Sequence, residues 1–324
     1  MREERINIFM QSRAFSAACF AFALAMFFIS MQLGGDAAAY SDGVLPLEGL
    51  RSFLQGSAGM AANFILFAVT TVFIVMVSRR FAFLGTITTL DAALFSLFQG
   101  AMPALAGQWT DGIWVALYVW ICTGSLFKIC DKPQATSEIF LIFAAVSLMT
   151  MFQSAFLILL PVFLVGAIQM RVITFKGFLA ALFGVITPYW IGLGMGMISL
   201  GELHYPEMQS IFSLDTVPVW LYYGFGIAAL GFVAVIANTF TLIKYRLQLR
   251  VYNGFTLVVL LASTIMLFVD SRNALAYIPL LNIVVATQVA HWFVAKNYKR
   301  KYIALTAVIL AIIAIFWLRT FYLK

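Results

Sequence analysis

Residues 139–170 read IFLIFAAVSLMTMFQSAFLILLPVFLVGAIQM and contain no charged side chain. A single helix of this length would extend about 48 Å at a rise of ~1.5 Å per residue, well beyond the ~30 Å hydrocarbon core of a bilayer. The stretch is nevertheless short for two full crossings. Because Gln153 lies near its middle and Pro161 in its second half, we expect a turn near Phe152–Ser154 that returns the chain to the side it left. Two forms remain open, a tight pair of crossings and a re-entrant hairpin.

The rest of the chain has the same apolar character. Of the 324 residues, 63% are hydrophobic and 10% are charged, whereas a soluble domain carries about 25% charged residues. The apolar runs are continuous rather than alternating, so helices rather than barrel strands must pair the backbone groups in lipid. We therefore predict an all-α polytopic membrane protein that forms one domain over residues 1–324, with eleven helices counting the pair in 139–170. The nine clear spans are Ala14–Leu33, Gly59–Val77, Phe81–Met102, Gly112–Phe127, Gly177–Ile198, Val217–Phe240, Gly254–Val269, Leu275–Ala295 and Ile303–Leu318.

The basic residues collect on one side of the predicted spans. Sixteen of the 20 Lys and Arg residues fall in the gaps that share the side of the N-terminus. The exceptions are Arg51, Arg272, Arg319 and Lys324. Since Lys and Arg flanking membrane spans stay on the cytoplasmic side, this bias predicts an N-terminus inside and a C-terminus outside. It also accounts for the net charge of +7 without nucleic acid as a partner.

The N-terminus imitates a secretory signal peptide. A basic segment precedes the apolar run, and Ala37-Ala38-Ala39 follows it like a cleavage site. The run Ala14–Leu33 has about 20 residues, however, whereas the apolar core of a signal peptide usually has about 7–15. We therefore expect this run to be retained as the first span.

The loop after the first span carries two carboxylates. Asp36 and Asp42 lie in a Gly-rich stretch at the predicted outer mouth of that span, and Arg51 follows in an apolar run. Such carboxylates can accept a proton from a hydroxyl nucleophile or bind a divalent cation. The alternative is a solvated turn, in which Gly and Asp are common. We take Asp36 and Asp42 as candidate catalytic residues and Arg51 as a candidate substrate-binding residue.

Asp91 is the most unusual residue of the chain. It falls about ten residues into the predicted span Phe81–Met102, where a charge costs at least ~2.5–3.5 kcal/mol. Such an acid indicates a proton relay, an ion site or a ligand for a polar substrate; the alternative is a protonated or hydrogen-bonded Asp that locks helix packing. Gln99, eight residues later, falls on the same helical face, which predicts a polar stripe directed into the bundle. In every case we expect Asp91 to face protein rather than lipid.

The other predicted outer loops hold weaker candidates. His204, with two neighbouring glutamates, could form a cation site or an acid–base group, although an ordinary polar loop is the alternative. Arg272 lies in the tight turn Asp270–Asn273 and could bind an anionic headgroup. His204 and His291 fall on opposite sides of the membrane and cannot share a metal ion. We therefore expect no metal site, and the sequence does not indicate a cofactor.

The middle of the chain, from Leu45 to about Trp190, resembles an uncharacterised family of multi-pass inner-membrane proteins found in Bacteroidetes. The motifs that carry the resemblance are Leu45-Pro46-Leu47, Ala62-Asn63, Phe152-Gln153-Ser154, Leu159-Leu160-Pro161, Arg171 to Lys176 and Gly184 to Tyr189. The resemblance implies a multi-pass protein of the bacterial inner membrane and brings no function with it.

A looser likeness, one of architecture, exists to the GT-C class of membrane glycosyltransferases. Proteins of that class have many short-looped helices and an acidic residue in the first external loop, and they use polyprenyl-phosphate-linked sugars at the outer face. The likeness implies that Asp36 or Asp42 is a general base or metal ligand. It also implies that Arg51 or Arg272 contacts the lipid-linked phosphate. The chain departs from the class in lacking a large external domain and a clear Asp-Glu pair.

These observations leave three functions open. The first is a GT-C-like enzyme of the cell envelope, with membrane lipids and a polyprenyl-phosphate-linked sugar as its partners. The second is a transporter of a small molecule or ion, in which Asp91, Gln99 and proline-interrupted spans line the path. The prolines concerned are Pro161, Pro188 and Pro279. The third is a non-catalytic membrane assembly partner.

Overall fold

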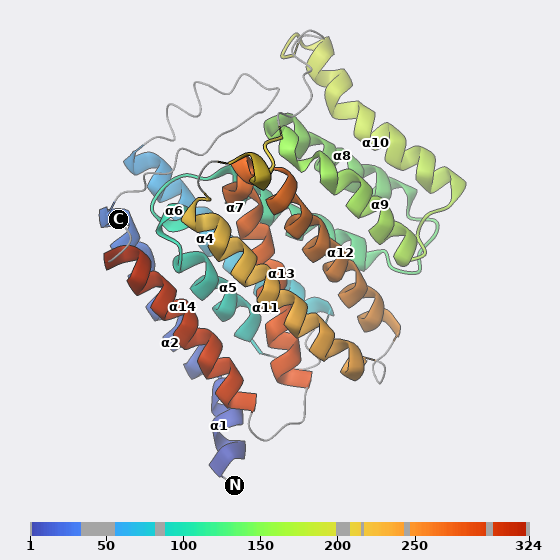
Figure 1. Cartoon of the computed structure of the whole chain (residues 1–324). Helices are drawn as coiled ribbons and strands as arrows, with labels where there is room; N and C mark the ends of the chain where they lie inside the picture. Colours follow the sequence, from blue (N-terminus) through green and yellow to red (C-terminus); the bar gives the residue numbers. More distant parts are fainter. Residues whose placement is uncertain are drawn as a thin grey trace.

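The computed structural model describes residues 2–33, 56–81, 88–198, 208–214, 217–242, 247–295 and 301–321. Every regular element within these ranges is helical, as predicted, and the helices pack side by side (Figure 1). The elements are α1 (Arg2–Met10), α2 (Arg13–Leu33), α4 (Ser57–Phe81), α5 (Leu90–Gly100), α6 (Pro103–Ala106), α7 (Asp111–Lys128), α8 (Thr136–Phe152), η1 (Ser154–Ile158), α9 (Leu159–Gln169), α10 (Phe175–Gly194), η3 (Ile211–Ser213), α11 (Val219–Leu242), α12 (Leu247–Val269), η4 (Ser271–Asn273), α13 (Ala274–Ala295) and α14 (Lys301–Phe321).

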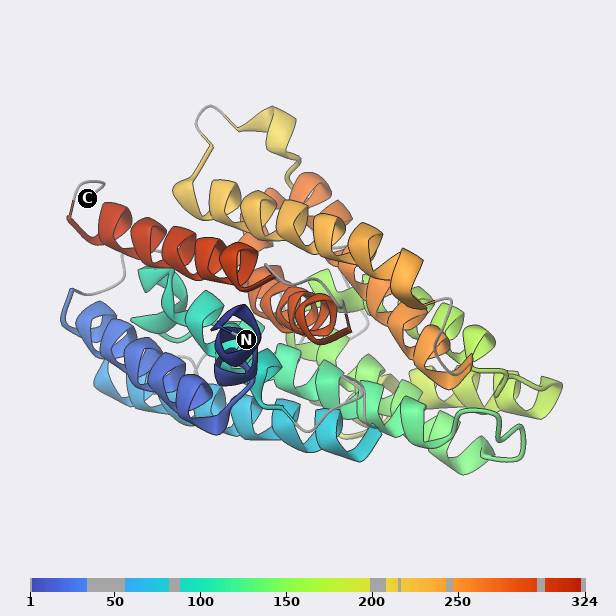
Figure 2. The same ribbon diagram turned by 90° about the horizontal axis from the view of Figure 1, so that it is seen from below.

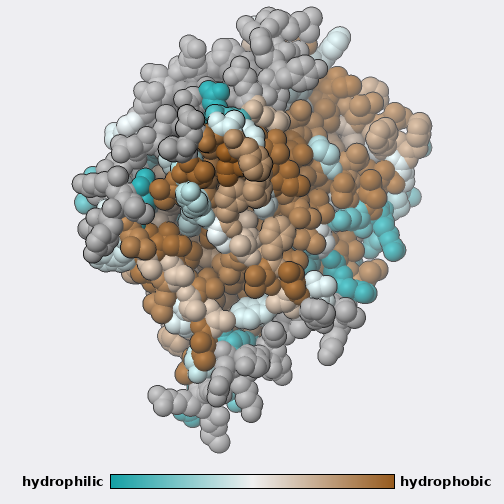
Figure 3. Space-filling model, viewed as in Figure 1, coloured by the Kyte–Doolittle hydropathy of each residue, from teal (hydrophilic) through white to brown (hydrophobic). Residues whose placement is uncertain are grey.

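Seven of the described helices are long and apolar enough to cross a membrane. They are α2, α4, α10, α11, α12, α13 with the short η4 before it, and α14. Large hydrophobic side chains of these helices are exposed, among them Val72 on α4, Phe183 on α10 and Leu310 on α14. The visible face of the molecule is correspondingly apolar (Figure 3). A surface of this kind requires lipid as its solvent, which identifies a multi-pass membrane protein.

Two of the nine expected spans are not among these seven. Within the span expected at Phe81–Met102, the described residues form only the 11-residue helix α5. The span expected at Gly112–Phe127 forms α7, which has 18 residues. Its charged ends, Asp111 and Lys128, and its Trp and Tyr residues make it less apolar, and it is not among the seven candidate spans. Both helices lie largely inside the bundle rather than in lipid.

The predicted turn in the long apolar stretch is confirmed. α8 ends at Phe152, Gln153 is extended (φ −144°, ψ 107°), and η1 and α9 lead the chain back. The backbone N–H of Asp131, before α8, donates to the carbonyl of Met170, after α9, at 3.0 Å. The two helices therefore form a closed hairpin. Pro161, which was expected to interrupt a span, instead lies in the first turn of α9, where its missing N–H costs no helical hydrogen bond.

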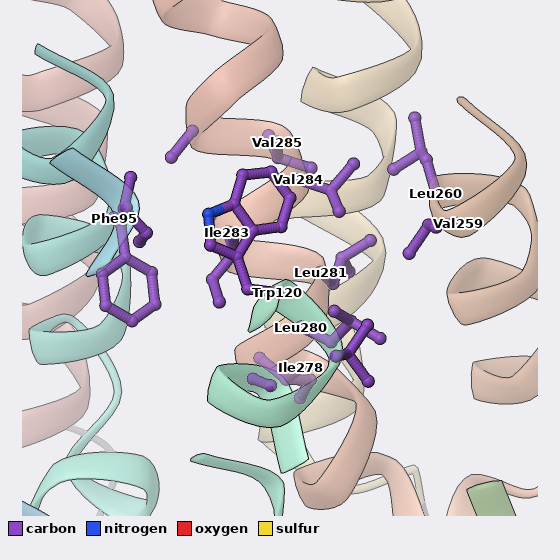
Figure 4. Close-up of a cluster of buried hydrophobic side chains, with 14 of the residues drawn as sticks. Phe95, Trp120, Val259, Leu260, Ile278, Leu280, Leu281, Ile283, Val284 and Val285 are labelled. Carbon is purple, nitrogen blue, oxygen red and sulfur yellow. The ribbon is translucent and has the colours of Figure 1, made fainter. Parts of the chain in front are cut away.

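α13 is the central helix of the bundle. It packs against α11, α5, α7 and α12, and it lies among the other helices when the bundle is seen from below (Figure 2). Its apolar side chains meet those of three neighbouring helices in a close-packed cluster (Figure 4). Because lipid is as apolar as these side chains, close packing rather than exclusion of water holds such helices together. The labelled residues are Ile278, Leu280, Leu281, Ile283, Val284 and Val285 of α13, with Phe95, Trp120, Val259 and Leu260 around them.

Helix ends that carry basic residues lie together. The ring of Phe81, at the end of α4, packs against the rings of Phe127 and Tyr252 with centroids 5.6 and 5.8 Å apart. The Asp131–Met170 hydrogen bond joins the ends of α7 and α9. We call this end of the bundle the basic end. Its basic residues include Arg79, Arg80, Lys128, Arg171 and Arg250.

The orientation of the bundle in the membrane stays a prediction. Reporter fusions at Lys132 and Arg250 should read as cytoplasmic, because both positions belong to the basic end and Lys and Arg favour that side. A fusion at Glu207 should read as periplasmic. A periplasmic signal at Lys132 would contradict the topology from the fourth predicted span onward.

Candidate functional site

α5 and α6 form a discontinuous helix inside the bundle. α5 ends at Gly100, and Met102 is extended (φ −112°, ψ 108°) before Pro103 begins α6. Proline disfavours a helical conformation in the preceding residue, which explains the break. All residues of α5 are buried, and the helix packs against α13, α2 and α4. Irregular backbone at membrane depth occurs only where protein or water surrounds it, so this segment belongs to the interior.

Asp91 lies in the first turn of this discontinuous helix. Only 1% of its surface is exposed, which confirms that it faces protein. Neither of its carboxyl oxygens has a partner at full hydrogen-bond geometry among the described residues; the side chain of Ser78 on α4 and the backbone N–H of Ala92 make weaker contacts with them. Since Ser78 directly precedes Arg79, Asp91 lies towards the basic end. The sequence predicted a position about ten residues into a long helix; the structure instead places Asp91 next to Leu90, the first residue of α5.

Side chains of neighbouring helices bind the carbonyl groups that the break leaves free. The last carbonyls of any helix have no partner within that helix. At the end of α5, the Tyr223 hydroxyl of α11 donates to the carbonyl of Phe98. At the end of α6, Nδ2 of Asn63 on α4 donates to the carbonyls of Leu105 and Ala106 at 2.9 and 3.2 Å. The interruption is therefore stabilised by specific polar contacts.

Gln99, near the end of α5, meets α13 in the middle of the bundle. Nδ2 of Asn282 donates to Oε1 of Gln99 at 3.1 Å, and the Tyr223 hydroxyl lies beside Asn282. Nε2 of Gln99 has no hydrogen-bond partner among the described residues. Pro279 lies inside α13 just before Asn282 and removes one backbone hydrogen bond there. We call Gln99, Asn282 and Tyr223 the core polar cluster; all three are buried.

A second buried polar cluster lies at the end opposite the basic end. Oδ2 of Asp270 accepts hydrogen bonds from the Tyr277 hydroxyl at 2.8 Å and from Nδ2 of Asn273 at 2.9 Å. Nε2 of Gln153 donates to Oδ1 of Asn273 at 3.2 Å. The α8–α9 turn and the α12–α13 turn are thereby joined, a contact that the sequence did not predict. Arg272, in that same turn, is partly exposed.

Replacement of Tyr277 by Phe should destabilise the protein by about 1 kcal/mol, because hydrogen bonds between membrane helices contribute roughly this much. The variant loses the single hydroxyl proton, which is shared between the carboxylate of Asp270 and the carbonyl of Ala155. The unfolding midpoint in detergent measures the effect. Tyr222→Phe is the matched control, because Tyr222 is 64% exposed. Equal midpoints for the two variants would contradict a structural role for this cluster.

A third set of polar side chains ties α11 and α12 to α13 nearer the basic end. Nε2 of Gln288 donates to Oδ1 of Asn253 at 2.7 Å and to Oγ1 of Thr256 at 2.8 Å. Nδ2 of Asn238 in turn donates to the side-chain oxygen of Gln288 at 3.0 Å. Amide-to-amide contacts of this kind hold membrane helices in register.

The structure separates the residues that the sequence proposed as a site. Asp91 and Gln99 share α5, whereas Arg272 lies at the opposite end of the bundle from Asp91. The sequence did not point to Asn282, Tyr223 or Tyr277. Asp36, Asp42, Arg51 and His204 lie outside the described residues.

The described residues contain no group of three or more His, Cys, Asp or Glu side chains that could hold a metal ion. Cys130 lies in the turn between α7 and α8. Its burial and the neighbouring Asp131 carboxylate raise the pKa of its thiol. A nucleophilic cysteine needs the opposite shift, so Cys130 is a poor candidate for covalent chemistry.

No family model, curated protein or solved structure matches this chain.

Proposed function

We propose that the protein is a proton-coupled membrane transporter of a small, uncharged polar solute. Asp91 carries the proton, and the core polar cluster forms part of the path of the solute. One observation carries the proposal: a carboxyl group buried on an interrupted helix, with neither oxygen at full hydrogen-bond geometry to a described residue. An ionisable residue at such a position indicates function by default.

The discontinuous helix supports transport because it supplies a site within the thickness of the membrane. Interrupted helices form the binding sites of many transporters, since their free backbone groups and helix ends can contact a ligand. Here α5 places Asp91 at its beginning and Gln99 at its end, eight residues and about 12 Å of helix apart. A proton site and a solute site on one rigid helix can influence each other through a movement of that helix.

The surroundings of Asp91 support its role as the proton carrier. Burial removes the carboxylate of Asp91 from water, which costs free energy, and its contacts with the Ser78 side chain and nearby backbone N–H groups offset this cost only in part. Protonation removes the charge. The protonated and ionised forms of Asp91 therefore favour different arrangements of the bundle. A transporter needs such a difference in stability between its states.

The core polar cluster supports an uncharged solute. Gln99, Asn282 and Tyr223 offer amide and hydroxyl groups, which donate and accept hydrogen bonds without a formal charge. Nε2 of Gln99 has no partner among the described residues and is available to a solute oxygen. All three side chains are buried, so the structure corresponds to a closed arrangement under this proposal.

Purified protein in liposomes that enclose a pH-sensitive dye tests the proposal. Neutral amino acids, sugars and polyols are added outside in turn, and the internal pH is recorded. We expect one of these solute classes to start an inward proton flux that protein-free liposomes lack. An imposed inward proton gradient should accelerate uptake of the same labelled solute. Uptake that is indifferent to the gradient, or no flux with any class, would contradict proton coupling.

A GT-C-like enzyme of the cell envelope is the second candidate function. α2, which leads into the loop with Asp36 and Asp42, reaches the end of the bundle where Arg272 lies. Ser30, near the end of α2, adjoins Gly107, and Gly112 adjoins the beginning of α13. The end of α2 that precedes the predicted acids and the turn that carries Arg272 thus belong to one end of the bundle, which favours this candidate.

Under the enzyme hypothesis, Asp36→Asn or Asp42→Asn should reduce glycan product by ~100-fold or more, because Asn keeps the size of the side chain but cannot accept a proton. Glycan profiles of cells that carry each variant measure the effect. Arg51→Gln and His204→Gln test the neighbouring substrate-binding candidates in the same assay. A wild-type profile in the double Asn variant would exclude catalysis by this loop.

A further inference from the structure

The outer surfaces of α4 and α7 enclose a pocket at the basic end. Its volume is about 490 Å³. We call it the α4–α7 pocket. The residues that line it include Phe73, Met76, Arg79, Arg80, Ile121 and Lys128.

The rim of the pocket is cationic. Arg79 and Arg80 end α4, Lys128 ends α7, and all three are exposed. No carboxylate is among the lining residues. Arg side chains present a planar fork of donors that matches phosphate oxygens, and Lys adds a compact charge. The rim therefore complements a phosphate group.

The floor of the pocket is apolar. Phe73, Met76 and Ile121 line it away from the rim, and Phe73 lies seven residues, or about 10 Å of helix, from Arg80. Gly124 leaves room between the helices, because a Cβ atom at that position would already lie 3.4 Å from Cγ2 of Val77. A phosphate at the rim would place any attached alkyl chain against this floor.

We propose that the α4–α7 pocket binds one anionic glycerophospholipid of the surrounding membrane. Its phosphate contacts Arg79, Arg80 and Lys128, and the upper part of one acyl chain lies on the apolar floor. α4 is itself long and apolar enough to span the membrane, so the pocket opens where lipid is the solvent. Basic pockets between membrane helices on the cytoplasmic side characteristically bind anionic headgroups. This inference is independent of the proposed transport function.

Native mass spectrometry of the detergent-solubilised protein, titrated with phosphatidylglycerol and with phosphatidylcholine of the same chains, tests the proposal. We expect phosphatidylglycerol to bind at least about tenfold more tightly. The triple variant R79Q/R80Q/K128Q should weaken its binding by roughly 100-fold, since each cation near the membrane surface contributes several-fold. The control triple variant K132Q/K176Q/R250Q removes the same charge from exposed positions outside the pocket, and we expect it to bind nearly as the wild type does.

The variant Gly124→Leu distinguishes the binding of a whole lipid from the binding of a phosphate group alone. The leucine fills the floor without changing the rim, so it should weaken the binding of phosphatidylglycerol about tenfold or more. In the wild type, glycerol phosphate should compete poorly with the lipid. Ile121→Trp, on the exposed side of the floor, provides a second filled variant if Gly124→Leu misfolds. Equal losses in the two triple variants would overturn the proposal. So would glycerol phosphate binding as tightly as the lipid, or unchanged lipid binding in a folded floor variant.

Discussion

Replacement of Asp91 by Asn is expected to abolish proton-coupled uptake while the amount of folded protein stays close to that of the wild type. Asn keeps the size and hydrogen-bonding capacity of the side chain but cannot take up a proton. The loss should be ~100-fold or more, comparable with the removal of other groups that transfer protons. Solute uptake and internal pH in the liposome assay measure it.

Glu138→Gln is the control for this prediction. Glu138 lies in the first turn of α8 near the basic end, and its carboxylate accepts a hydrogen bond from the adjacent Ser137 hydroxyl, so its neutralisation should leave uptake unchanged. Infrared spectra give an independent readout, because a protonated Asp91 contributes a carboxylic acid carbonyl band that the Asn variant lacks. If Asp91 only locks the packing of α5, Asp91→Asn will retain proton-coupled uptake, and the assignment of Asp91 as the proton carrier fails.

Replacement of Gly112 by Ala is expected to destabilise the protein strongly, although it adds only one methyl group. A Cβ atom at Gly112 would lie 2.6 Å from the carbonyl oxygen of Ala276 and 2.7 Å from that of Leu275. Both are backbone atoms of the central helix α13 and cannot rotate away. Overpacking in a close-packed interior costs about 1–3 kcal/mol, and we expect the upper part of that range. The unfolding midpoint in detergent measures the change.

Gly226→Ala is the matched control. A Cβ atom at Gly226 meets nothing within 4 Å, and the position is exposed on α11. Since Ala is favoured over Gly in a helix by about 1 kcal/mol, this variant should be neutral or slightly more stable than the wild type. A Gly112→Ala protein as stable as the Gly226→Ala protein would show that α7 and α13 do not make this close contact.

Local features of the sequence predicted most of the helices and one turn. Uninterrupted apolar runs must become helices in lipid, because no water is present to bind their backbone groups. The turn at Gln153 followed from the length of the uncharged stretch, since 32 residues exceed one crossing, and from the position of Gln153 near its middle. The grouping of basic residues such as Arg79 and Lys128 at one end also followed from their spacing.

The break after Gly100 and the partners of the buried polar groups did not follow from local sequence. Pro103 lay just beyond the expected span Phe81–Met102. Within that span, no residue indicated a short helix rather than one that crosses the membrane. Gln99 and Asn282 are 183 residues apart in sequence. Their contact depends on how α5 and α13 pack against each other, and the spacing of apolar residues along each helix does not predict it.

By itself, the sequence determined that this protein is helical, that it belongs in a membrane and which helix ends share a side. Only the tertiary structure decided which helices form the interior. α10 and α13 have the same mean hydropathy of 1.5, yet 22% of the apolar window of α10 is buried against 100% of that of α13. In water, apolar residues mark the core; in a bilayer, lipid and core are equally apolar. Hydropathy therefore places a helix in the membrane, and packing against other helices decides whether it faces protein or lipid.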